Sequence, residues 1–209
     1  MSLLTDTSDL AAAHHAKGDF DRAIADYEKA IALDKTNAAA FLARASAWRS
    51  KGEIEKALVD LHEAVKLEKK ASGPHMTRGA LYHAKGQHNE AIADYSEAIK
   101  RDPKNAQAFN GRGACYYGKG DFDKAIADFD AALKLDPKYA GAMVNRANAW
   151  RAKKDFTRAK TDYEGALTLK PDLLTARKGV EDMTKLIAKK ASGAPTQPDA
   201  APKAEHDHN

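Results

Sequence analysis

The segment GDFDRAIADYEKAIALDKTN at residues 18–37 returns four more times at a spacing of 34 residues, and this repeat decides the fold. The other copies read GEIEKALVDLHEAVKLEKKA (52–71), GQHNEAIADYSEAIKRDPKN (86–105), GDFDKAIADFDAALKLDPKY (120–139) and KDFTRAKTDYEGALTLKPDL (154–173). A fixed period of this length is typical of solenoids, in which each repeat packs against its neighbours. It divides residues 4–173 into the units 4–37, 38–71, 72–105, 106–139 and 140–173.

Each unit, numbered here from position 1 to position 34, carries two helical stripes. Alanine occupies positions 20 and 27 of all five units, and a large apolar residue occupies position 24. These positions fall on one face of a helix. The first half has its own stripe at positions 4, 8 and 11. Glycine at position 15 of the first four units separates the two helices, and Lys154 takes its place in the fifth.

This combination of alanine, aromatic and glycine positions resembles the tetratricopeptide repeat (TPR) family over residues 4–173. The resemblance implies an all-α fold, a right-handed α-solenoid of tandem helix-turn-helix hairpins. Unit 1 fits least well, because Thr7, Ala11 and His14 replace the aromatic, glycine and tyrosine that the family favours. We therefore expect its first helix to be shortened, frayed or adapted as a cap. In unit 3, Pro74 predicts a delayed start of the first helix.

Beyond the repeats, residues 174–190 predict a C-terminal capping helix. Leu174, Val180, Met183 and Ile187 are expected to cover unit 5 while the charged residues face water. Residues 191–209 lack apolar bulk and are rich in proline and alanine, which predicts a disordered tail.

Composition narrows the function classes. The formal charge of +4 is too small to favour a nucleic-acid partner, and no apolar run approaches the ~20 residues that would span a bilayer, so membrane insertion is not expected. The single cysteine excludes an intramolecular disulfide. No leader is evident at the N-terminus, which predicts a cytoplasmic protein if Met1 is the natural start, and permits an exported one if a leader was removed.

The TPR resemblance implies that the first helices line a concave groove. Position 12 of the five units is basic or aromatic, never acidic, which favours an acidic or carboxylate-bearing peptide. The alternative is a solvated face whose basic row is incidental. The expected groove residues are Leu42, Arg49, Met76, His83, Asn110, Tyr117, Asn145, Asn148 and Arg151.

One TPR subtype can be tested directly. Members that clamp the C-terminal carboxylate of a chaperone use lysine, asparagine and arginine at defined groove positions of three successive units. The equivalent residues of units 1 to 3 are Ser8, Ala12, Ala43, Gly73 and Thr77, and the frames that start at units 2 and 3 fail in the same way. The sequence therefore argues against a carboxylate clamp.

A second recurrent pattern is polar. Arginine occupies position 7 of units 2 to 5 (Arg44, Arg78, Arg112, Arg146), and aspartate occupies position 23 of every unit (Asp26, Asp60, Asp94, Asp128, Asp162). Position 7 lies on the packing stripe, so the arginines should be partly buried and need partners. We expect a structural Arg–Asp ladder. Because unit 1 has the Asp but no Arg, pairing from one unit to the next is favoured, although pairing within a unit also fits the count. The alternative is that the arginines bind a ligand.

Residues suited to chemistry are few. His14 and His15 point in different directions on a helix, and neither His83 nor His88 has a cysteine or acid at zinc-finger spacing, so no metal site is predicted. Cys115 reads as a packing residue. No catalytic residue and no cofactor are expected.

The favoured function is a protein-interaction scaffold or adaptor that binds a peptide segment, with self-association through unit 1 left open. The alternatives are an accessory subunit of an enzyme or secretion assembly and, less favoured, an RNA-binding helical repeat.

Overall fold

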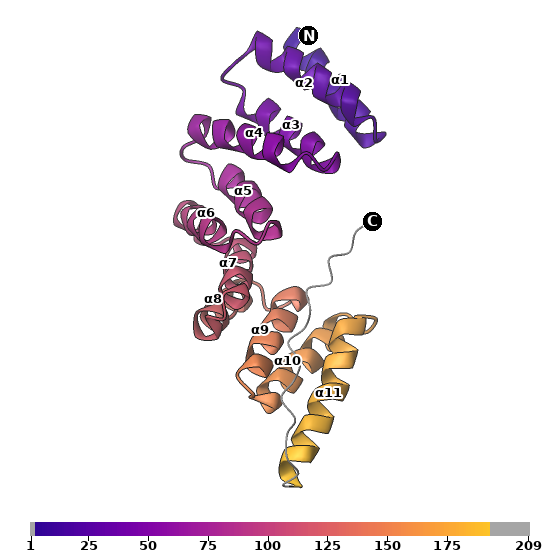
Figure 1. The fold of residues 1–209 in the computed structure, drawn as a ribbon, viewed down its shortest axis with the longest axis vertical. Helices are drawn as coiled ribbons and strands as arrows, with labels where there is room; N and C mark the ends of the chain where they lie inside the picture. The colour runs from indigo at the N-terminus through magenta and orange to yellow at the C-terminus, as the bar shows by residue number, and fades with distance from the viewer. Residues whose placement is uncertain (1–2, 193–209) are drawn as a thin grey trace.

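The computed structural model describes residues 3–192, with side chains from residue 7 onward, and within that range it consists of helices and short turns (Figure 1). Most of the tail predicted over 191–209 lies outside the described residues. None of the described helices is both long and apolar enough to cross a bilayer. The helices are α1 (Leu3–Ala16), α2 (Phe20–Leu33), α3 (Ala38–Ser50), α4 (Ile54–Leu67), α5 (Gly73–Ala84), α6 (His88–Arg101), α7 (Ala106–Gly118), α8 (Phe122–Leu135), α9 (Ala140–Ala152), α10 (Phe156–Leu169) and α11 (Leu174–Ala191).

Each pair from α1–α2 to α9–α10 forms a helical hairpin within one unit of the repeat. The residue at position 15 turns the chain with a positive φ: the four glycines lie between +72° and +81°, and Lys154 lies at +61°. Glycine suits this position because it has no Cβ to clash in the left-handed region. The all-α repeat fold expected from the sequence is therefore confirmed.

Alanines and large side chains alternate through the core. The alanines at positions 20 and 27 are fully buried in every unit, and the large residue at position 24 is at most 5% exposed. Small residues of the same hairpin or of the following helix admit the position-24 rings. A Cβ on Gly113 would lie 2.7 Å from the Phe129 ring, and one on Gly179 would lie 2.6 Å from the Tyr163 ring. The small residues thus allow the close helix contacts that the large residues fill.

The hairpins stack into an arc (Figure 1). First helices of neighbouring units contact each other, α1 with α3, α5 with α7 and α7 with α9, and α9 also contacts α11. Among the described residues, second helices make no comparable contacts with each other. Elements on the inner side of a curved stack are the ones that crowd together, so the first helices line the inner surface.

The ends of the predicted array need two corrections. The suggestion that the first helix is shortened is wrong, because α1 has 14 residues, as many as α2. The expected cap contact of Leu174 is also wrong, because its side chain is 73% exposed. The expected contacts of Met183 and Val180 are confirmed: α11 buries Met183 together with Ala176 and Gly179 against unit 5, and Val180 packs against the same cluster. The delayed helix in unit 3 is confirmed: α5 begins at Gly73, one residue later in its unit than α3, α7 and α9, and has Pro74 in its first turn.

Candidate peptide-binding groove

Most of the inner surface is built from helices that contain no carboxylate; the exception is α1, whose sequence contains Asp6 and Asp9. Helices α3, α5, α7 and α9 have neither Asp nor Glu in their sequences. Each of the second helices, from α2 to α10, has at least two acidic residues. Acidic side chains near these inner helices therefore come from the second helices that pack behind them and from the two end helices, α1 and α11. The positive charge that the inner surface offers to a ligand therefore depends on which of its basic side chains lack an acidic partner.

Arg49 is the groove cation with the least competition. Its side chain is exposed, and its guanidinium forms no hydrogen bond or ion pair with any residue that the structure describes. It borders a small cavity of about 40 Å³ between α3, α4 and α5, whose other lining residues are Ala45, Ser46, Leu61, Thr77 and Leu81. A cavity of this size holds a single small group beside a free positive charge.

The other members of the position-12 row have neighbours. Arg151 lies beside the Tyr163 hydroxyl, whose pKa is raised by burial and drawn back down by this guanidinium. His15 Nε2 lies 3.4 Å from the Ser50 hydroxyl. Tyr117 packs against the Phe122 ring with centroids 5.5 Å apart. No carboxylate neutralises this row among the described residues.

Three asparagines expected in the groove form hydrogen bonds within the chain. Asn145 Nδ2 donates to Asn110 Oδ1 at 2.9 Å, and Asn110 Nδ2 donates to the Tyr139 hydroxyl at 3.3 Å. The Tyr163 hydroxyl donates to Asn148 Oδ1 at 2.5 Å. These bonds tie α7 to α9 and α9 to α10, so the asparagines position the inner helices. Leu42 and Met76 are half-buried against the cores of units 2 and 3.

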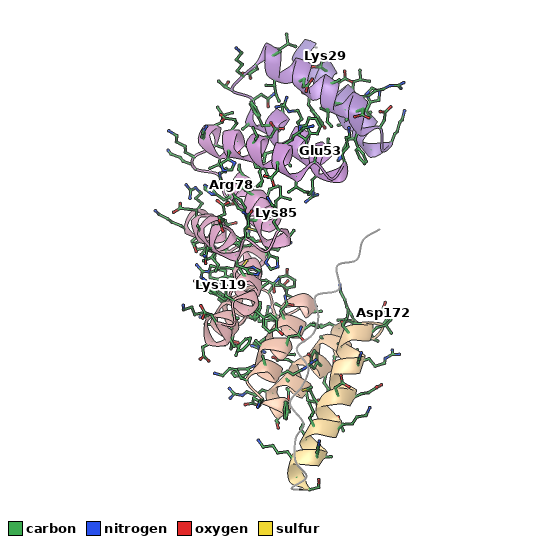
Figure 2. All side chains as sticks on the ribbon, in the orientation of Figure 1. Lys29, Glu53, Arg78, Lys85, Lys119 and Asp172 are labelled. Carbon is green, nitrogen blue, oxygen red and sulfur yellow. The ribbon has the colours of Figure 1, made fainter. Side chains whose placement is uncertain are left out.

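The predicted arginines and aspartates do form pairs, but within units. Arg44 Nε donates to Asp60 Oδ2 at 2.8 Å, and Nη2 donates to Oδ1 at 2.6 Å. The same two-bond geometry joins Arg78 to Asp94, Arg112 to Asp128 and Arg146 to Asp162. The favoured expectation of pairing from one unit to the next is wrong. Positions 7 and 23 face each other across the antiparallel hairpin; Arg78 lies where α5 and α6 meet (Figure 2).

The pairs are nearly enclosed. The aspartates are at most 8% exposed, and the arginine side chains 15–24%. The hydrogen bonds that each arginine donates to its aspartate raise the pKa of the arginine, which stays charged. A remaining nitrogen reaches the preceding unit in two cases: Arg112 Nη1 donates to the Ser96 hydroxyl at 3.1 Å, and Arg146 Nη1 to Asp130 at 2.5 Å. The ladder therefore neutralises these four arginines and leaves them little capacity for a ligand.

Unit 1 holds its aspartate differently. Lys29 Nζ donates to Asp26 Oδ1 at 2.8 Å, and His14 Nδ1 lies 3.0 Å from Oδ2. The hydrogen bond from Lys29 and, to a lesser extent, that of His14 lower the pKa of Asp26. Position 7 of this unit is Leu10, which is half exposed. In unit 3, His75 joins the Arg78 pair, with Nδ1 2.8 Å from Asp94 Oδ1.

Lysines in the hairpin turns make a further set of contacts between units, which the sequence analysis missed. Lys51 Nζ donates to Asp21 at 2.5 Å, and Lys119 Nζ donates to Asn89 at 2.5 Å. Lys85 pairs with Glu55 and Lys153 with Asp123 in the same way, each across 30 residues (Figure 2 labels Lys85 and Lys119). The signal was present as lysine at position 14 of every unit.

Family models match most of this architecture. Residues 77–140 and 116–173 match a model described as Tetratricopeptide repeat, and residues 11–48 match one described as TPR repeat. The chain belongs to the tetratricopeptide repeat family. TPR proteins are in general interaction modules rather than enzymes, and the TPR fold supports a role for this chain as a protein-interaction scaffold. No curated protein matches the chain in sequence.

Solved TPR structures resemble most or part of this chain. The crystal structure of YrrB, a TPR protein with an unusual peptide-binding site, has a TM-score of 0.71 at 21% identity and covers 84% of this chain and 90% of its own. A TPR protein from Parabacteroides merdae has a TM-score of 0.79 at 20% identity, covering 90% of this chain and 75% of its own. The first TPR of Spaghetti (RPAP3), bound to the HSP90 peptide SRMEEVD, has a TM-score of 0.55 at 27% identity over 56% of this chain and 93% of its own.

One cluster in this TPR protein was not expected from its sequence. The cluster consists of His83, His88 and Cys115, which lie together where units 3 and 4 meet. Their spacing in the sequence matches no known zinc motif. Burial raises the pKa of the Cys115 thiol to about 12. Burial also lowers the pKa of His83, and the neighbouring His88 lowers it further. Sequence distance concealed this cluster because Cys115 belongs to the next unit.

Proposed function

We propose that this TPR protein is a scaffold that binds an acidic, extended peptide segment along the inner surface formed by α3, α5, α7 and α9. The observation that carries the proposal is Arg49, an exposed and unpaired guanidinium beside a small cavity on a surface whose helices have no acidic residue. A carboxylate of the peptide would satisfy this cation, and charge-assisted hydrogen bonds of this kind are among the strongest that a peptide can make.

Charge along the rest of the surface supports the same partner. The ladder aspartates neutralise Arg44, Arg78, Arg112 and Arg146, whereas Arg49 and Arg151 have no acidic partner among the described residues. These two arginines stand at position 12 of units 2 and 5, so they mark opposite ends of the surface. An extended acidic segment can reach both, with small side chains of the inner helices below it.

The peptide bound to the first TPR of Spaghetti (RPAP3), SRMEEVD, contains three acidic residues and gives a chemical precedent. This chain lacks the clamp residues for a terminal carboxylate, with Ser8, Ala12 and Ala43 in three of those places. We therefore propose recognition of acidic side chains inside the segment, with no requirement for a free C-terminus.

The test is a binding measurement with the full-length chain and labelled peptides of about ten residues. An acidic peptide should bind more tightly than its amide analogue, in which Glu and Asp become Gln and Asn. Amidation of the peptide's C-terminus should change little. The double substitution Arg49→Ala with Arg151→Ala should weaken binding about tenfold or more, because each arginine contributes a charge-assisted contact.

The matched control removes two arginines from second helices, Arg22→Ala with Arg158→Ala, and so changes the net charge equally. Binding should then stay close to that of the unmodified chain. Equal losses in the two double variants, or equal affinity for the acidic and amide peptides, would refute recognition by the inner surface.

A further inference from the structure

Two histidines and the only cysteine of the chain meet between units 3 and 4. His83 lies in the last turn of α5, His88 begins α6, and Cys115 lies on α7. One ligand atom from each of the three lies within 4.8 Å of the other two. We propose that His83, His88 and Cys115 bind a Zn²⁺ ion.

The distances suit a tetrahedral ion. Zn–S and Zn–N bonds of about 2.3 and 2.0 Å place neighbouring ligand atoms roughly 3.3–3.6 Å apart. His83 Nδ1 already lies 3.3 Å from Cys115 Sγ. The ligand atoms that lie farthest apart, up to 4.8 Å, would reach this spacing through side-chain shifts on the order of 1 Å. Thiolate and imidazole are ligand types that Zn²⁺ prefers, and three protein ligands leave a fourth position for water.

An independent observation points to a ligand at His88. Its Nδ1 atom is buried and has no hydrogen-bond partner among the residues that the structure describes. A buried nitrogen without a partner loses its hydrogen bonds to water and gains none in return, so it calls for an explanation. The ring sits against Gly118, where a Cβ would lie 2.7 Å from both Cε1 and Nε2. The absence of a side chain at Gly118 thus leaves space for the His88 ring, although Nδ1 of that ring has no hydrogen-bond partner in the described part of the chain.

At the other joints between units, the three equivalent positions hold residues that do not form a set of metal ligands. His83 is at position 12, His88 is at position 17, and Cys115 is at position 10 of the next unit. The same set is His15, Phe20 and Ala47 between units 1 and 2, Arg49, Ile54 and Leu81 between units 2 and 3, and Tyr117, Phe122 and Ala149 between units 4 and 5. Tyr117 with Phe122, and His15 with Phe20, are simple ring contacts. Three ligand-type side chains occur together at one joint out of four.

Cobalt provides the test, because Co²⁺ occupies zinc sites and is visible in absorption spectra. The metal-free, full-length chain should bind one equivalent of Co²⁺ with a thiolate-to-cobalt charge-transfer band in the near ultraviolet. Since the chain has one cysteine, this band reports Cys115 alone. Added Zn²⁺ should remove the band and raise the melting temperature by mass action. Binding also releases the thiol proton.

The repeat itself supplies variants that should fold. Cys115→Ala installs the residue of units 2 and 5, and His88→Phe installs that of units 1, 4 and 5. Circular dichroism should match the unmodified chain. Cys115→Ala should lose the charge-transfer band and the Zn²⁺-dependent rise in melting temperature, and His88→Phe should weaken Co²⁺ binding at least tenfold.

The control replaces two histidines of the tail, His206→Ala with His208→Ala, and should leave the band unchanged. A cobalt spectrum without a thiolate band would overturn the proposal and leave the cluster as a thiol–imidazole packing contact. Undiminished Co²⁺ affinity in His88→Phe would also overturn it.

Discussion

Arg112 and Asp128 form a two-bond ion pair across one hairpin, with Nε donating to Oδ2 and Nη2 to Oδ1, both at 2.8 Å. Asp128 is 7% exposed, so water cannot replace its partner. Arg112→Ala should lower the free energy of unfolding by about 3 kcal/mol, because it leaves a buried carboxylate without compensation. Urea denaturation monitored by circular dichroism measures this loss.

The control for that substitution is an exposed pair. Lys66 lies 2.6 Å from Glu63 and is 67% exposed, so Lys66→Ala should cost less than about 1 kcal/mol. The double variant Arg112→Ala with Asp128→Ala should recover part of the loss, because neither charge is then stranded. A cost near zero for Arg112→Ala would show that the arginine is dispensable for Asp128.

Leu10 occupies the place of the missing ladder arginine. The four pairs join residues 16 apart, and Leu10 lies 16 residues before Asp26. Because Leu10 is half exposed, its loss costs little. Lys29 and His14 already contact the two Asp26 oxygens, so Leu10→Arg exchanges these contacts for a two-bond pair and should stabilise unit 1 by about 1 kcal/mol or less. Hydrogen exchange of α2 amides, which reports local opening, measures the gain.

Leu10→Lys serves as the comparison for that change, because an ammonium cannot make the two parallel bonds of a guanidinium. It should give a smaller gain. Equal protection of the α2 amides in both variants would indicate a general charge effect rather than completion of the ladder.

Lys154 holds the left-handed turn that glycine holds in the other units, with φ at +61°. A side chain in this region is strained by roughly 1 kcal/mol. Lys154→Gly should therefore raise the free energy of unfolding by about 0.5–1 kcal/mol, measured by thermal or urea denaturation. Ala152→Gly, two residues earlier at the end of α9, should have the opposite sign, because glycine lowers helix stability. A lower free energy of unfolding in Lys154→Gly would contradict the claim that Lys154 is strained in this turn.

Gly113 and Gly165 should respond oppositely to alanine. A Cβ on Gly113 would approach the buried Phe129 ring to 2.7 Å and the Ala125 carbonyl oxygen to 3.2 Å. Neither can move freely, so Gly113→Ala should destabilise by about 1–3 kcal/mol. At Gly165 the nearest atom is Met143 Sδ at 3.4 Å, an ordinary contact.

Gly165→Ala should therefore stabilise α10 by about 0.5–1 kcal/mol through helix propensity alone. Both variants are measured in the same denaturation experiment, so each is the control for the other. The same sign of change in the two would show that local packing does not decide the effect of a Cβ in these helices.

Periodicity made the helices predictable. Position 15 marks every hairpin turn, and the buried alanines mark the face of each second helix. The ladder residues were also recognisable, since a charged residue on an apolar stripe needs a partner. Their pairing was not, because the count of Arg and Asp fits two arrangements. The sequence also could not predict that Arg49 lacks a partner among the described residues, or that Asn110, Asn145 and Asn148 form hydrogen bonds within the chain. Both outcomes depend on the side chains of neighbouring helices.

The amino-acid sequence by itself determined the repeat, the helices and the family, because a 34-residue period imposes the same local preferences and the same buried face on each unit. Only the tertiary structure decided which groups meet: Arg44 with Asp60 inside a hairpin, and Cys115 with His83 across a joint between units. Such contacts depend on the angle at which the helices pack, and that angle is set by many side chains together rather than by the spacing of any two.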